Sequence, residues 1–420
     1  MTGNLDIVVI GGGAAGFFAA INCANTYRKA KVTILEATKK PLNKVRISGG
    51  GRCNVTHNCF DPARLVQNYP RGGKALRGPF SRFQPQDTVE WFANRGVKLK
   101  TEADGRMFPI TNNSETVVNC LLNEAKKAKV NLQIGTAVKS VIKKENKFEI
   151  NLKTGKTLKC DRILIATGSN PQGIKIAKNL GHKIIPAVPS LFTFNIKDSR
   201  LESLAGVSCD RVSIQLNCSN LSKEISKKMT QTGPILITHW GLSGPVILKL
   251  SAWGARVLFE TKYQSELIIN WLPEYNSETL RDLLLKTKLQ MPKKKLVNYS
   301  PLPIPKRLWQ SLIHFVGIGD RKIWTEISKK ELNRLVGELV RGSYKISGKG
   351  VFKEEFVTCG GVSLKEVNFK TMESKISPGI YFAGEVLDID GVTGGFNFQS
   401  AWTTGWLASQ AMGQEILSPT

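Results

Sequence analysis

The feature that most constrains the fold is a glycine pattern close to the N-terminus. In the string GGGAAG, Gly11, Gly13 and Gly16 follow the spacing Gly-x-Gly-x-x-Gly. A short apolar segment, DIVVIG, precedes the glycines, and AAGFFAAINCANTYRK follows with helical periodicity. The next segment, KVTILE, has the composition of a second strand and ends at Glu36. This order predicts a βαβ unit and therefore a parallel sheet.

Each part of this pattern has a physical reason to bind a dinucleotide. Gly11 permits a tight turn, Gly13 lets the backbone approach a pyrophosphate, and Gly16 allows close helix packing. Free amides at the helix start, including those of Ala14 and Ala15, would stabilise the anion. Glu36, followed by Ala37, would accept hydrogen bonds from ribose hydroxyls.

Two later segments indicate which dinucleotide is bound. ILIATG ends at Ala166, Thr167 and Gly168, where a strand would lead into a second turn beside the same ligand. YFAGE includes Gly384 and Glu385 and would bring a carboxylate to the ribityl or pyrophosphate region. A strand end such as ILIATG is ordinary by itself. The three pieces in this order resemble the FAD-binding fold of two-dinucleotide flavoproteins.

Other segments extend this first domain. SETVVNCLLNEAKKAK is predicted as a helix capped by Ser114, with a buried side made of Val117, Val118, Leu121, Leu122 and Ala125. KFEINL and KTLKC predict an antiparallel meander around the turn KTG, and RILIATG predicts a buried strand. Near the C-terminus, GIYFAGEVLD predicts a strand and FNFQSAWTTGWLASQAMG a helix.

The pattern changes from about Leu191. LFTFNI, VSIQL, GPILIT, ARVLFE and ELIINWL are predicted as short strands without helices between them, which favours a small barrel or sandwich. After Ser277 the pattern is helical, with a capping box from Ser328 to Glu331 and a turn-rich linker, YSPLPIPKR. We therefore expect an α/β protein, α+β overall. A Rossmann-like FAD-binding domain of the two-dinucleotide type (1–190 and 351–420) would be interrupted by an inserted β-barrel-like and helical domain (191–350).

Composition narrows the classes of partner. The eight cysteines form no Cys-x-x-Cys pair and there are only four histidines, so we expect no metal site and no dithiol chemistry. The sequence contains no uninterrupted run of about 18 apolar residues, which argues against a membrane span. We therefore expect a soluble, cytoplasmic protein without a membrane partner. The formal charge of +27 indicates a basic surface, densest over residues 271–350, that favours anionic ligands.

A second glycine-rich string, RISGGGRCNVTH, carries the closest resemblance. Together with GRMFPIT, THWGLSGPVILKLS, TCGGVSLKEVNFKTMESK and GIYFAGEVLDIDGVTGGFNFQSAWTTGWLA, it resembles the BaiN-like family of NAD(P)/FAD-dependent oxidoreductases, which includes aminoacetone oxidase and bile-acid dehydro-reductase flavoproteins. The resemblance covers nearly the whole chain. It implies that Gly11, Gly13, Gly16 and Glu36 hold the ADP half of FAD, with Val138 lining the adenine.

The resemblance also implies contacts on both sides of the rest of the cofactor. The residues implied along the pyrophosphate, ribityl chain and flavin are Arg46, Gly50, Gly51, Arg52, Cys53 and Asn54. Those implied on the other side are Glu385, Asp388, Gly394, Gly395, Asn397 and Phe398. A helix that starts near Gly395 would direct amides and its positive dipole end toward the flavin atoms where negative charge develops on reduction.

The chain departs from the family pattern after ATG, where GSNPQGIKIAKNLGH replaces a longer loop on the substrate side. His57 stands where an amide side chain is expected, and we interpret it as a loop residue. No second Gly-x-Gly-x-x-Gly follows a strand, so a nicotinamide that reduces the flavin, NADH or NADPH, would bind only transiently on the substrate face. The alternative is that the electrons come from the substrate itself and leave to oxygen. His239 is a weak catalytic candidate, with a histidine satisfied within the barrel as the alternative, and Tyr69 and Arg106 are weaker candidates.

We expect an FAD-dependent oxidoreductase that moves a hydride to or from the flavin, with a small organic substrate bound between the FAD domain and the insertion. The charge leaves open an RNA-directed flavoprotein of the tRNA-modifying type, in which the basic segment 271–350 binds nucleic acid. A non-enzymatic flavin redox sensor is the third alternative. The sequence does not predict the identity of the substrate, whether the enzyme is a reductase or an oxidase, or the oligomeric state.

Overall fold

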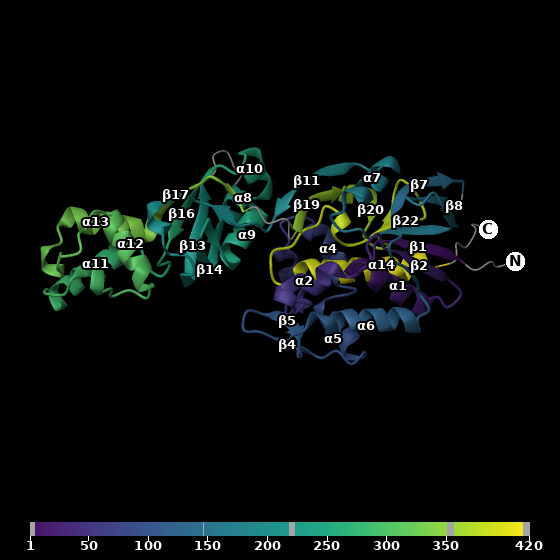
Figure 1. Cartoon of the computed structure of the whole chain (residues 1–420), viewed down its shortest axis with the longest axis horizontal. Helices are drawn as coiled ribbons and strands as arrows, with labels where there is room; N and C mark the ends of the chain where they lie inside the picture. The colour runs from purple at the N-terminus through teal and green to yellow at the C-terminus, as the bar shows by residue number, and fades with distance from the viewer. Residues whose placement is uncertain (1–4, 146, 218–222, 351–356, 415–420) are drawn as a thin grey trace. The chain divides into compact units, whose positions relative to one another are not determined.

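The computed structural model describes residues 5–145, 147–217, 223–350 and 357–414, and these divide between two compact units. The first unit comprises Met1–Ala187 and Val357–Thr420, and the second comprises Val188–Phe356. Figure 1 labels the main elements of both. The domain boundary expected at residue 351 and the cysteine at position 218 lie outside the described residues.

A seven-stranded sheet forms the centre of the first unit, with the order β20-β21-β22-β10-β1-β2-β6. The five parallel strands are β22 (Ile380–Phe382), β10 (Arg162–Ile165), β1 (Asp6–Ile10), β2 (Lys31–Leu35) and β6 (Asn131–Gln133). Strands β20 (Val367–Asn368) and β21 (Glu373–Ser374) add an antiparallel edge. The predicted βαβ unit is confirmed, because β1 pairs with β2 in parallel and α1 (Ala14–Thr26) connects them. Since β22 pairs with β10, both ends of the chain build this sheet.

The two longest apolar helices of this unit lie in backbone contact. A Cβ atom on Gly405 of α14 (Phe396–Met412) would lie 2.8 Å from the carbonyl oxygen of Ala15 in α1. Figure 1 shows α1 and α14 beside β1 and β2. The close crossing carries the start of α14 to the end of the sheet where the glycine turn lies.

The remaining elements surround this core. The predicted meander is confirmed as an antiparallel sheet of β7, β8 and β9. The elements are α2 (Asn43–Gly51), β3 (Thr56–His57), α3 (Pro62–Leu65), α4 (Gly73–Phe80), α5 (Pro85–Ala93), β4 (Leu99–Thr101), β5 (Arg106–Pro109), α6 (Ser114–Lys127), β7 (Val138–Lys144), β8 (Lys147–Leu152), β9 (Thr157–Cys160), α7 (Pro171–Asn179), β11 (Ile184–Ser190) and β19 (Val357–Val362).

One predicted cap is wrong. The N-cap of α6 is Asn113, whose side chain accepts a hydrogen bond from the Glu115 amide at 2.9 Å. Ser114, the predicted cap, is the first helical residue, and its hydroxyl donates to the Arg46 carbonyl at 2.8 Å. Asn and Ser are equally good caps, so the choice depends on a tertiary contact of the serine.

The second unit contains a sheet that closes on itself. Its order is β17-β16-β13-β14-β15-β12-β18, and every pair given is antiparallel. The two ends of this order, β17 (Gly342–Ile346) and β18 (Gly348–Lys349), are consecutive pieces of one segment. That segment pairs with β16 (Ser265–Asn270) and then with β12 (Phe194–Asn195), which closes a small barrel. The other strands are β13 (Ser208–Asn217), β14 (Thr230–Thr238) and β15 (Gly241–Ser243).

The prediction that no helices interrupt these strands is wrong. ARVLFE forms α10 (Ala255–Glu260), which follows α9 (Pro245–Trp253), and α8 (Lys223–Lys228) precedes β14. Ala255 and Leu258, three residues apart, are buried, whereas Phe259 is 50% exposed. A run of six mostly apolar residues is compatible with the two-residue period of a strand and with the 3.6-residue period of a helix. Here burial of only one side favours the helix.

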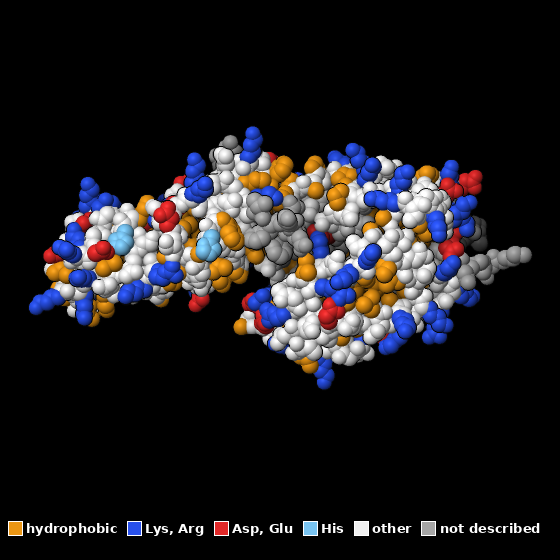
Figure 2. All heavy atoms as spheres, viewed as in Figure 1, with side chains coloured by type: hydrophobic (Ala, Val, Ile, Leu, Met, Phe, Trp, Pro, Cys, Tyr) orange, Lys and Arg blue, Asp and Glu red, His pale blue; other side chains and the backbone are white. Residues whose placement is uncertain are grey.

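Three helices extend this unit: α11 (Ser277–Gln290), α12 (Lys306–Phe315) and α13 (Lys329–Arg341). The predicted capping box of α13 is confirmed, since Ser328 and Glu331 exchange hydrogen bonds. Lys and Arg side chains stand out from the surface of this helical part in Figure 2. The opposite, apolar sides of the helices join the barrel core.

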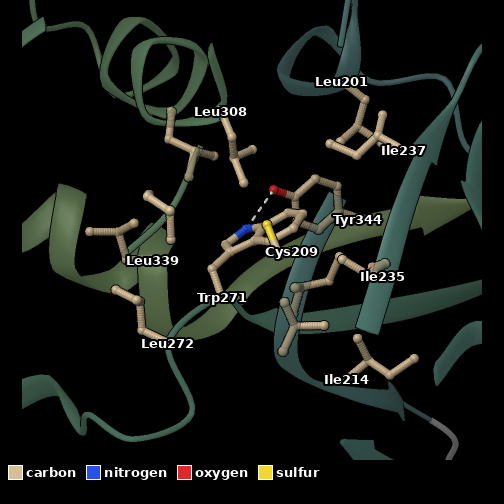
Figure 3. Close-up of a cluster of buried hydrophobic side chains, with 14 of the residues drawn as sticks. Leu201, Cys209, Ile214, Ile235, Ile237, Trp271, Leu272, Leu308, Leu339 and Tyr344 are labelled. Atoms are coloured by element: carbon tan, nitrogen blue, oxygen red, sulfur yellow. Dashed lines mark hydrogen bonds between the residues drawn. The ribbon is translucent and has the colours of Figure 1, made fainter. Parts of the chain in front are cut away.

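This shared core is held by large buried side chains (Figure 3). The Trp271 indole donates to the Tyr344 hydroxyl at 3.2 Å, and both side chains are almost fully buried. Leu308 of α12 and Leu339 of α13 lie in the same cluster as Ile235 of the barrel. The helical part is therefore packed on the barrel through one continuous apolar cluster. Among the helices in the described ranges, none is both long and apolar enough to cross a membrane.

Candidate functional site

The turn between β1 and α1 contains two glycines that the fold itself requires. Gly11 has φ +112°, and a Cβ there would lie 2.5 Å from the Ala166 carbonyl oxygen. A Cβ on Gly16 would lie 2.0 Å from the Gly11 carbonyl oxygen. Gly13 differs, because a Cβ there would meet no atom within 4 Å. The backbone at Gly13 therefore faces open space that a ligand can enter.

The Glu36 carboxylate lies against this turn. Its Oε2 accepts a hydrogen bond from the Gly12 amide at 2.7 Å, and its Oε1 accepts from the Thr38 amide at 2.7 Å. The Thr136 amide donates to the Glu36 carbonyl at 2.8 Å, so the segment that leads to the buried Val138 runs beside Glu36. Ala37, two residues after the end of β2, is exposed. Glu36, Ala37 and Val138 are thus gathered at one edge of the turn.

A lysine that the sequence did not single out joins three predicted segments. Lys44 Nζ lies 2.6 Å from Glu385 Oε2 and donates to Ser169 Oγ at 3.0 Å. The Thr358 amide donates to the other oxygen of Glu385 at 3.0 Å. A Cβ on Gly384 would lie 3.0 Å from the Ala15 Cβ. The ATG turn, the AGE turn and the start of α1 therefore lie together.

The glycine-rich string forms an irregular loop rather than a helix end. Within α2, Ser48, Gly49 and Gly50 have non-helical backbone angles, and the φ values at Gly49, Gly50 and Gly51 are +57°, +69° and +83°. A Cβ on Gly50 or Gly51 would meet no atom within 4 Å, whereas one on Gly49 would lie 2.8 Å from the Phe108 ring. The loop is packed on one side and open at Gly50 and Gly51, like the turn at Gly13.

The two arginines of this string are held by carboxylates. Arg52 Nη1 lies 2.6 Å from Glu102 Oε1, and its guanidinium lies 4.0 Å from the centre of the Phe108 ring. Arg46 Nη1 pairs with Glu115, while its buried Nε has no hydrogen-bond partner among the described residues. Arg52 thus anchors the loop to β5 through Phe108, and Arg46 retains an unused donor.

Cys53 is a packing residue. It is fully buried with φ +61°, and burial raises the pKa of its thiol to about 12. A thiol with this pKa is not a thiolate at neutral pH, so it is inert as a nucleophile. The seven cysteines that the structure describes are all free thiols. In the same described part of the chain, no three His, Cys, Asp or Glu side chains gather to hold a metal ion.

The start of α14 is fixed against the strand that follows Cys53. Gly395, the N-cap, has φ +91°, and a Cβ there would lie 2.4 Å from the Thr56 carbonyl oxygen. In the orientation that satisfies its neighbours, the Asn54 amide accepts from the Gly395 amide and donates to the Thr56 carbonyl, each at 3.0 Å. Asn397 exchanges two hydrogen bonds with Gly391, at 2.8 and 2.9 Å. The helix start is therefore rigidly placed.

Buried side chains extend this attachment along α14. Gln399 Oε1 accepts hydrogen bonds from the hydroxyls of Thr56 at 2.6 Å and Thr88 at 2.9 Å, and the Trp402 indole donates to the Val55 carbonyl at 2.9 Å. Phe398 stacks on Trp402, with ring centres 5.7 Å apart. Buried polar groups that are all satisfied specify one arrangement.

Acidic residues near this helix start were only partly predicted. The amide of Asp388, a predicted site residue, donates to the Val362 carbonyl at 3.1 Å, and its side chain is half-buried. Asp390, which the sequence reasoning missed, is fully buried and forms a two-pronged ion pair with Arg71. The only sequence pattern that could have pointed to Asp390 is its position two residues after Asp388 in the string LDID. Lys44 offered none, because it is one of 60 Lys and Arg residues.

The weaker catalytic candidates have other partners. The Tyr69 hydroxyl is buried and donates to the Phe396 carbonyl at 2.7 Å, and burial raises the pKa of Tyr69 well above its ordinary value. Arg106 pairs with Glu102 and Asp104. His239 lies exposed in the turn between β14 and β15, so the alternative of a satisfied barrel histidine is wrong. These positions place Tyr69 and Arg106 in structural contacts.

The interpretation of His57 as a loop residue is wrong, because His57 is the last residue of strand β3. Its ring stacks on Phe396 with centres 4.7 Å apart, and its Nε2 lies 3.1 Å from the Asp104 carbonyl oxygen. Burial lowers the pKa of His57 below its ordinary value, so the ring is neutral at neutral pH. An amide side chain could not make this ring contact at the start of α14.

Taken together, these residues fit FAD. Two backbone segments, at Gly13 and at Gly50 and Gly51, leave open space where side chains would obstruct a ligand. The buried Arg46 Nε has no hydrogen-bond partner among the residues that the structure describes, and the α14 N-cap is a glycine without a capping side chain. An anionic, extended dinucleotide satisfies all three features.

Comparison with known proteins places the chain in a family. The model described as "HI0933-like protein Rossmann domain" matches residues 5–411, which confirms the resemblance seen in the sequence. A relative named ribosomal RNA dihydrouridine synthase, from Escherichia coli (strain K12), is 30% identical over 416 residues, or 96% of this chain and 97% of that protein. The 3-dehydro-bile acid delta(4,6)-reductase of Clostridium scindens is 29% identical over 96% of this chain and 98% of that protein.

A solved structure agrees with the fold. The 3-ketosteroid-delta4-(5alpha)-dehydrogenase of Rhodococcus jostii RHA1, in complex with 4-androstene-3,17-dione, is similar with a TM-score of 0.50. It is 14% identical, and the match covers 98% of each chain. At this identity the likeness bears on the fold alone.

Proposed function

This chain belongs to the HI0933-like family of Rossmann-domain proteins and is an FAD-dependent oxidoreductase, and from this premise we propose that it reduces a carbon–carbon double bond conjugated to a carbonyl. We propose a small organic substrate as the first candidate. Two curated relatives support this reaction class, and the match to this chain covers 97% of one and 98% of the other.

The two relatives share one bond change despite their different substrates. Dihydrouridine is uridine with a saturated C5–C6 bond, and that bond is conjugated to the C4 carbonyl. A delta(4,6)-reductase acting on a 3-dehydro bile acid saturates a double bond conjugated to the 3-keto group. In both cases a hydride adds to the carbon that the carbonyl makes electrophilic. This common chemistry, rather than either substrate, is what we transfer to the chain.

Bound FAD would supply the hydride, and the residues of the chain would bind and orient the FAD. The open backbone at Gly13 would accept the pyrophosphate, with Glu36 at the ribose and Arg46 Nε as a further donor. The start of α14, fixed by Asn54 and Gly395, would direct amides toward the side of the flavin that becomes negative.

We propose a nicotinamide coenzyme, NADH or NADPH, as a transient reductant. A second dinucleotide fingerprint is absent from the sequence, so the coenzyme would visit the substrate face, leave, and be replaced by the substrate. This order predicts ping-pong kinetics. It also predicts that a competitive inhibitor of the substrate competes with the coenzyme.

Anaerobic flavin spectroscopy tests the proposal. The purified protein is loaded with FAD, reduced with NADH or NADPH, and then mixed with a 3-oxo-Δ4 steroid, with uridine, or with oxygen. Reoxidation by a conjugated acceptor at a rate above that with oxygen supports the proposal. Absence of bound FAD contradicts it, as does a reduced flavin that reacts with oxygen but with neither these acceptors nor a ribosomal RNA transcript. Steady turnover also excludes a flavin redox sensor.

A second candidate substrate is a uracil base within RNA. Two curated relatives, from Escherichia coli and from Haemophilus influenzae, are named ribosomal RNA dihydrouridine synthases, the latter 29% identical over 97% of this chain. The net charge of +27 favours a polyanionic partner. Reoxidation of the reduced flavin by a ribosomal RNA transcript, but not by free uridine, selects this candidate.

A further inference from the structure

The helical part of the second unit, residues 277–341, carries more positive charge than its fold uses. It contains fourteen Lys and Arg residues and six Asp and Glu residues. Four of the acidic side chains have internal partners, with Glu331 paired to Lys322 at 2.6 Å and Glu338 to Arg200 at 2.7 Å. Glu326 accepts from the Ile323 amide, and Asp320 lies 2.6 Å from His314. Most of the cations therefore have no carboxylate to neutralise them.

Helix α13 concentrates these cations on its solvent side. Its buried stripe is Leu332, Leu335, Val336 and Leu339. Lys330, Arg334 and Arg341 lie on the opposite, exposed stripe, four and then seven residues apart. The spacing of one or two helical turns places them in one row along the helix.

The row begins at an open hollow of about 560 Å³. Lys329, Lys330, Asn333 and Arg334 line it. Arg281 of α11 donates its Nε to Asn333 Oδ1 at 3.0 Å, which brings a fourth cation to the edge. We name Arg281, Lys329, Lys330 and Arg334 the α13 basic cluster. In the described part of the chain, no carboxylate lies within ion-pair distance of any of the four.

Fold stability does not explain this arrangement. Lys329 and Lys330 occupy the first turn of α13, where the positive end of the helix dipole disfavours positive charge. Neighbouring like charges repel one another as well. Elsewhere in the same unit a buried cation is neutralised, as in the pairs of Arg200 with Asp198 and Glu338. An anionic partner would relieve both penalties in the α13 basic cluster.

We propose that the α13 basic cluster docks the phosphate backbone of a structured RNA. This proposal rests on the second candidate substrate above, and it goes further by assigning the docking surface to the helical part of the second unit. Arginine offers paired donors that match phosphate oxygens, and lysines add long, adaptable charges. The side chains that line the hollow end in ammonium, guanidinium or amide groups, and none of them is an aromatic or branched aliphatic side chain of the kind that anchors a helix in a bilayer.

A matched pair of triple variants tests the docking surface. The first is Lys329→Gln, Lys330→Gln and Arg334→Gln. The control is Arg28→Gln, Lys126→Gln and Lys178→Gln, which removes the same charge from exposed positions of the first unit. Both are loaded with FAD and compared with the parent chain. Fluorescence anisotropy measures binding of a ribosomal RNA hairpin transcript at several salt concentrations.

The α13 variant is expected to lose about tenfold or more in RNA affinity, with a smaller slope of log K against log salt, by about one for each lost contact. The control is expected to bind nearly as the parent does. Equal losses in the two variants would show a general field effect and overturn the proposal. Undetectable RNA binding by the parent chain at low salt would overturn it too.

Two further measurements separate this proposal from others. Vesicles containing anionic lipid replace the RNA in a parallel assay, and loss of vesicle binding with unchanged RNA binding would assign the cluster to a membrane surface instead. FAD content and reoxidation by small conjugated acceptors are measured for both variants and should match the parent chain. If neither small conjugated acceptors nor the ribosomal RNA transcript reoxidise the reduced flavin while RNA binding depends on the cluster, the proposed reaction is wrong and the docking surface stands.

Discussion

Lys44 Nζ lies 2.6 Å from Glu385 Oε2, and this ion pair joins two segments that are 341 residues apart in the sequence. The lysine also donates to Ser169 Oγ at 3.0 Å. The start of α2, which follows β2, the turn after β10 and the turn after β22 are thereby held together near the carboxyl ends of three parallel strands. In open α/β sheets, ligands bind at this end.

The first prediction concerns this ion pair. Lys44→Met should weaken FAD binding by about tenfold, equivalent to about 1.4 kcal/mol, because Glu385 loses the cation that positions its carboxylate. Fluorescence titration of the apoprotein with FAD measures the change. Lys39→Met, at an exposed position in the same connection, is the control and should bind FAD as the parent does. An unchanged affinity in Lys44→Met would contradict the assignment.

The second prediction separates the glycines of the first turn. Gly16→Ala should destabilise the apoprotein by about 1–3 kcal/mol, because the new Cβ would lie 2.0 Å from the Gly11 carbonyl oxygen. Gly13→Ala should change stability by no more than about 0.5 kcal/mol. It should nevertheless lower FAD affinity, since its Cβ enters only the open space. Urea unfolding of the two apoproteins and FAD titration measure these effects. Normal FAD affinity in Gly13→Ala would place the cofactor elsewhere.

The third prediction concerns how Arg52 acts. Arg52→Ala should lose FAD because the glycine loop loses its anchor to Glu102 and Phe108. Glu102→Gln should then show a similar loss, although Glu102 belongs to none of the predicted cofactor segments. A double-mutant cycle on FAD affinity measures the coupling, which a positioning role makes large. If Arg52→Ala loses FAD and Glu102→Gln does not, Arg52 contacts the cofactor directly.

The fourth prediction concerns Cys53. Since burial raises the pKa of its thiol to about 12, almost no thiolate is present at pH 8 and alkylation of the native protein should be very slow. Among the seven cysteines that the structure describes, Cys59 is partly exposed and should react first. Mass mapping after iodoacetamide treatment gives the order. Cys53→Ser should keep FAD and most activity, and loss of activity at wild-type FAD content would indicate a reactive thiol.

The fifth prediction concerns pH and His182. Burial lowers the pKa of His182 in the folded protein, although Glu366 lies 3.2 Å from its Nδ1. The unfolded chain binds a proton on this imidazole near pH 6.5, whereas the folded protein binds it only at lower pH. The free energy of unfolding should therefore fall as the pH drops below about 6.5. His182→Asn should reduce this dependence. An equally steep decline in the variant would assign it to other groups.

Local sequence patterns predicted the elements whose periodicity is unambiguous. The βαβ unit with its glycine turn, the meander around KTG and α13 with its capping box all agree with the structure. Their signals lie within about 30 residues and depend on steric rules for glycine, caps and alternating burial. ARVLFE failed because six apolar-rich residues fit either period, and packing on one side decided in favour of a helix.

For the candidate site, the sequence by itself determined which backbone must be glycine and that a dinucleotide fingerprint follows β1. Only the tertiary structure decided which side chains meet there. Lys44 reaches Glu385, Arg52 is held by Glu102, and Tyr69 binds the start of α14. Glycine geometry is a local property of the chain. The pairing of charges 50 or 341 residues apart depends on strand order and burial, which the folded molecule alone specifies.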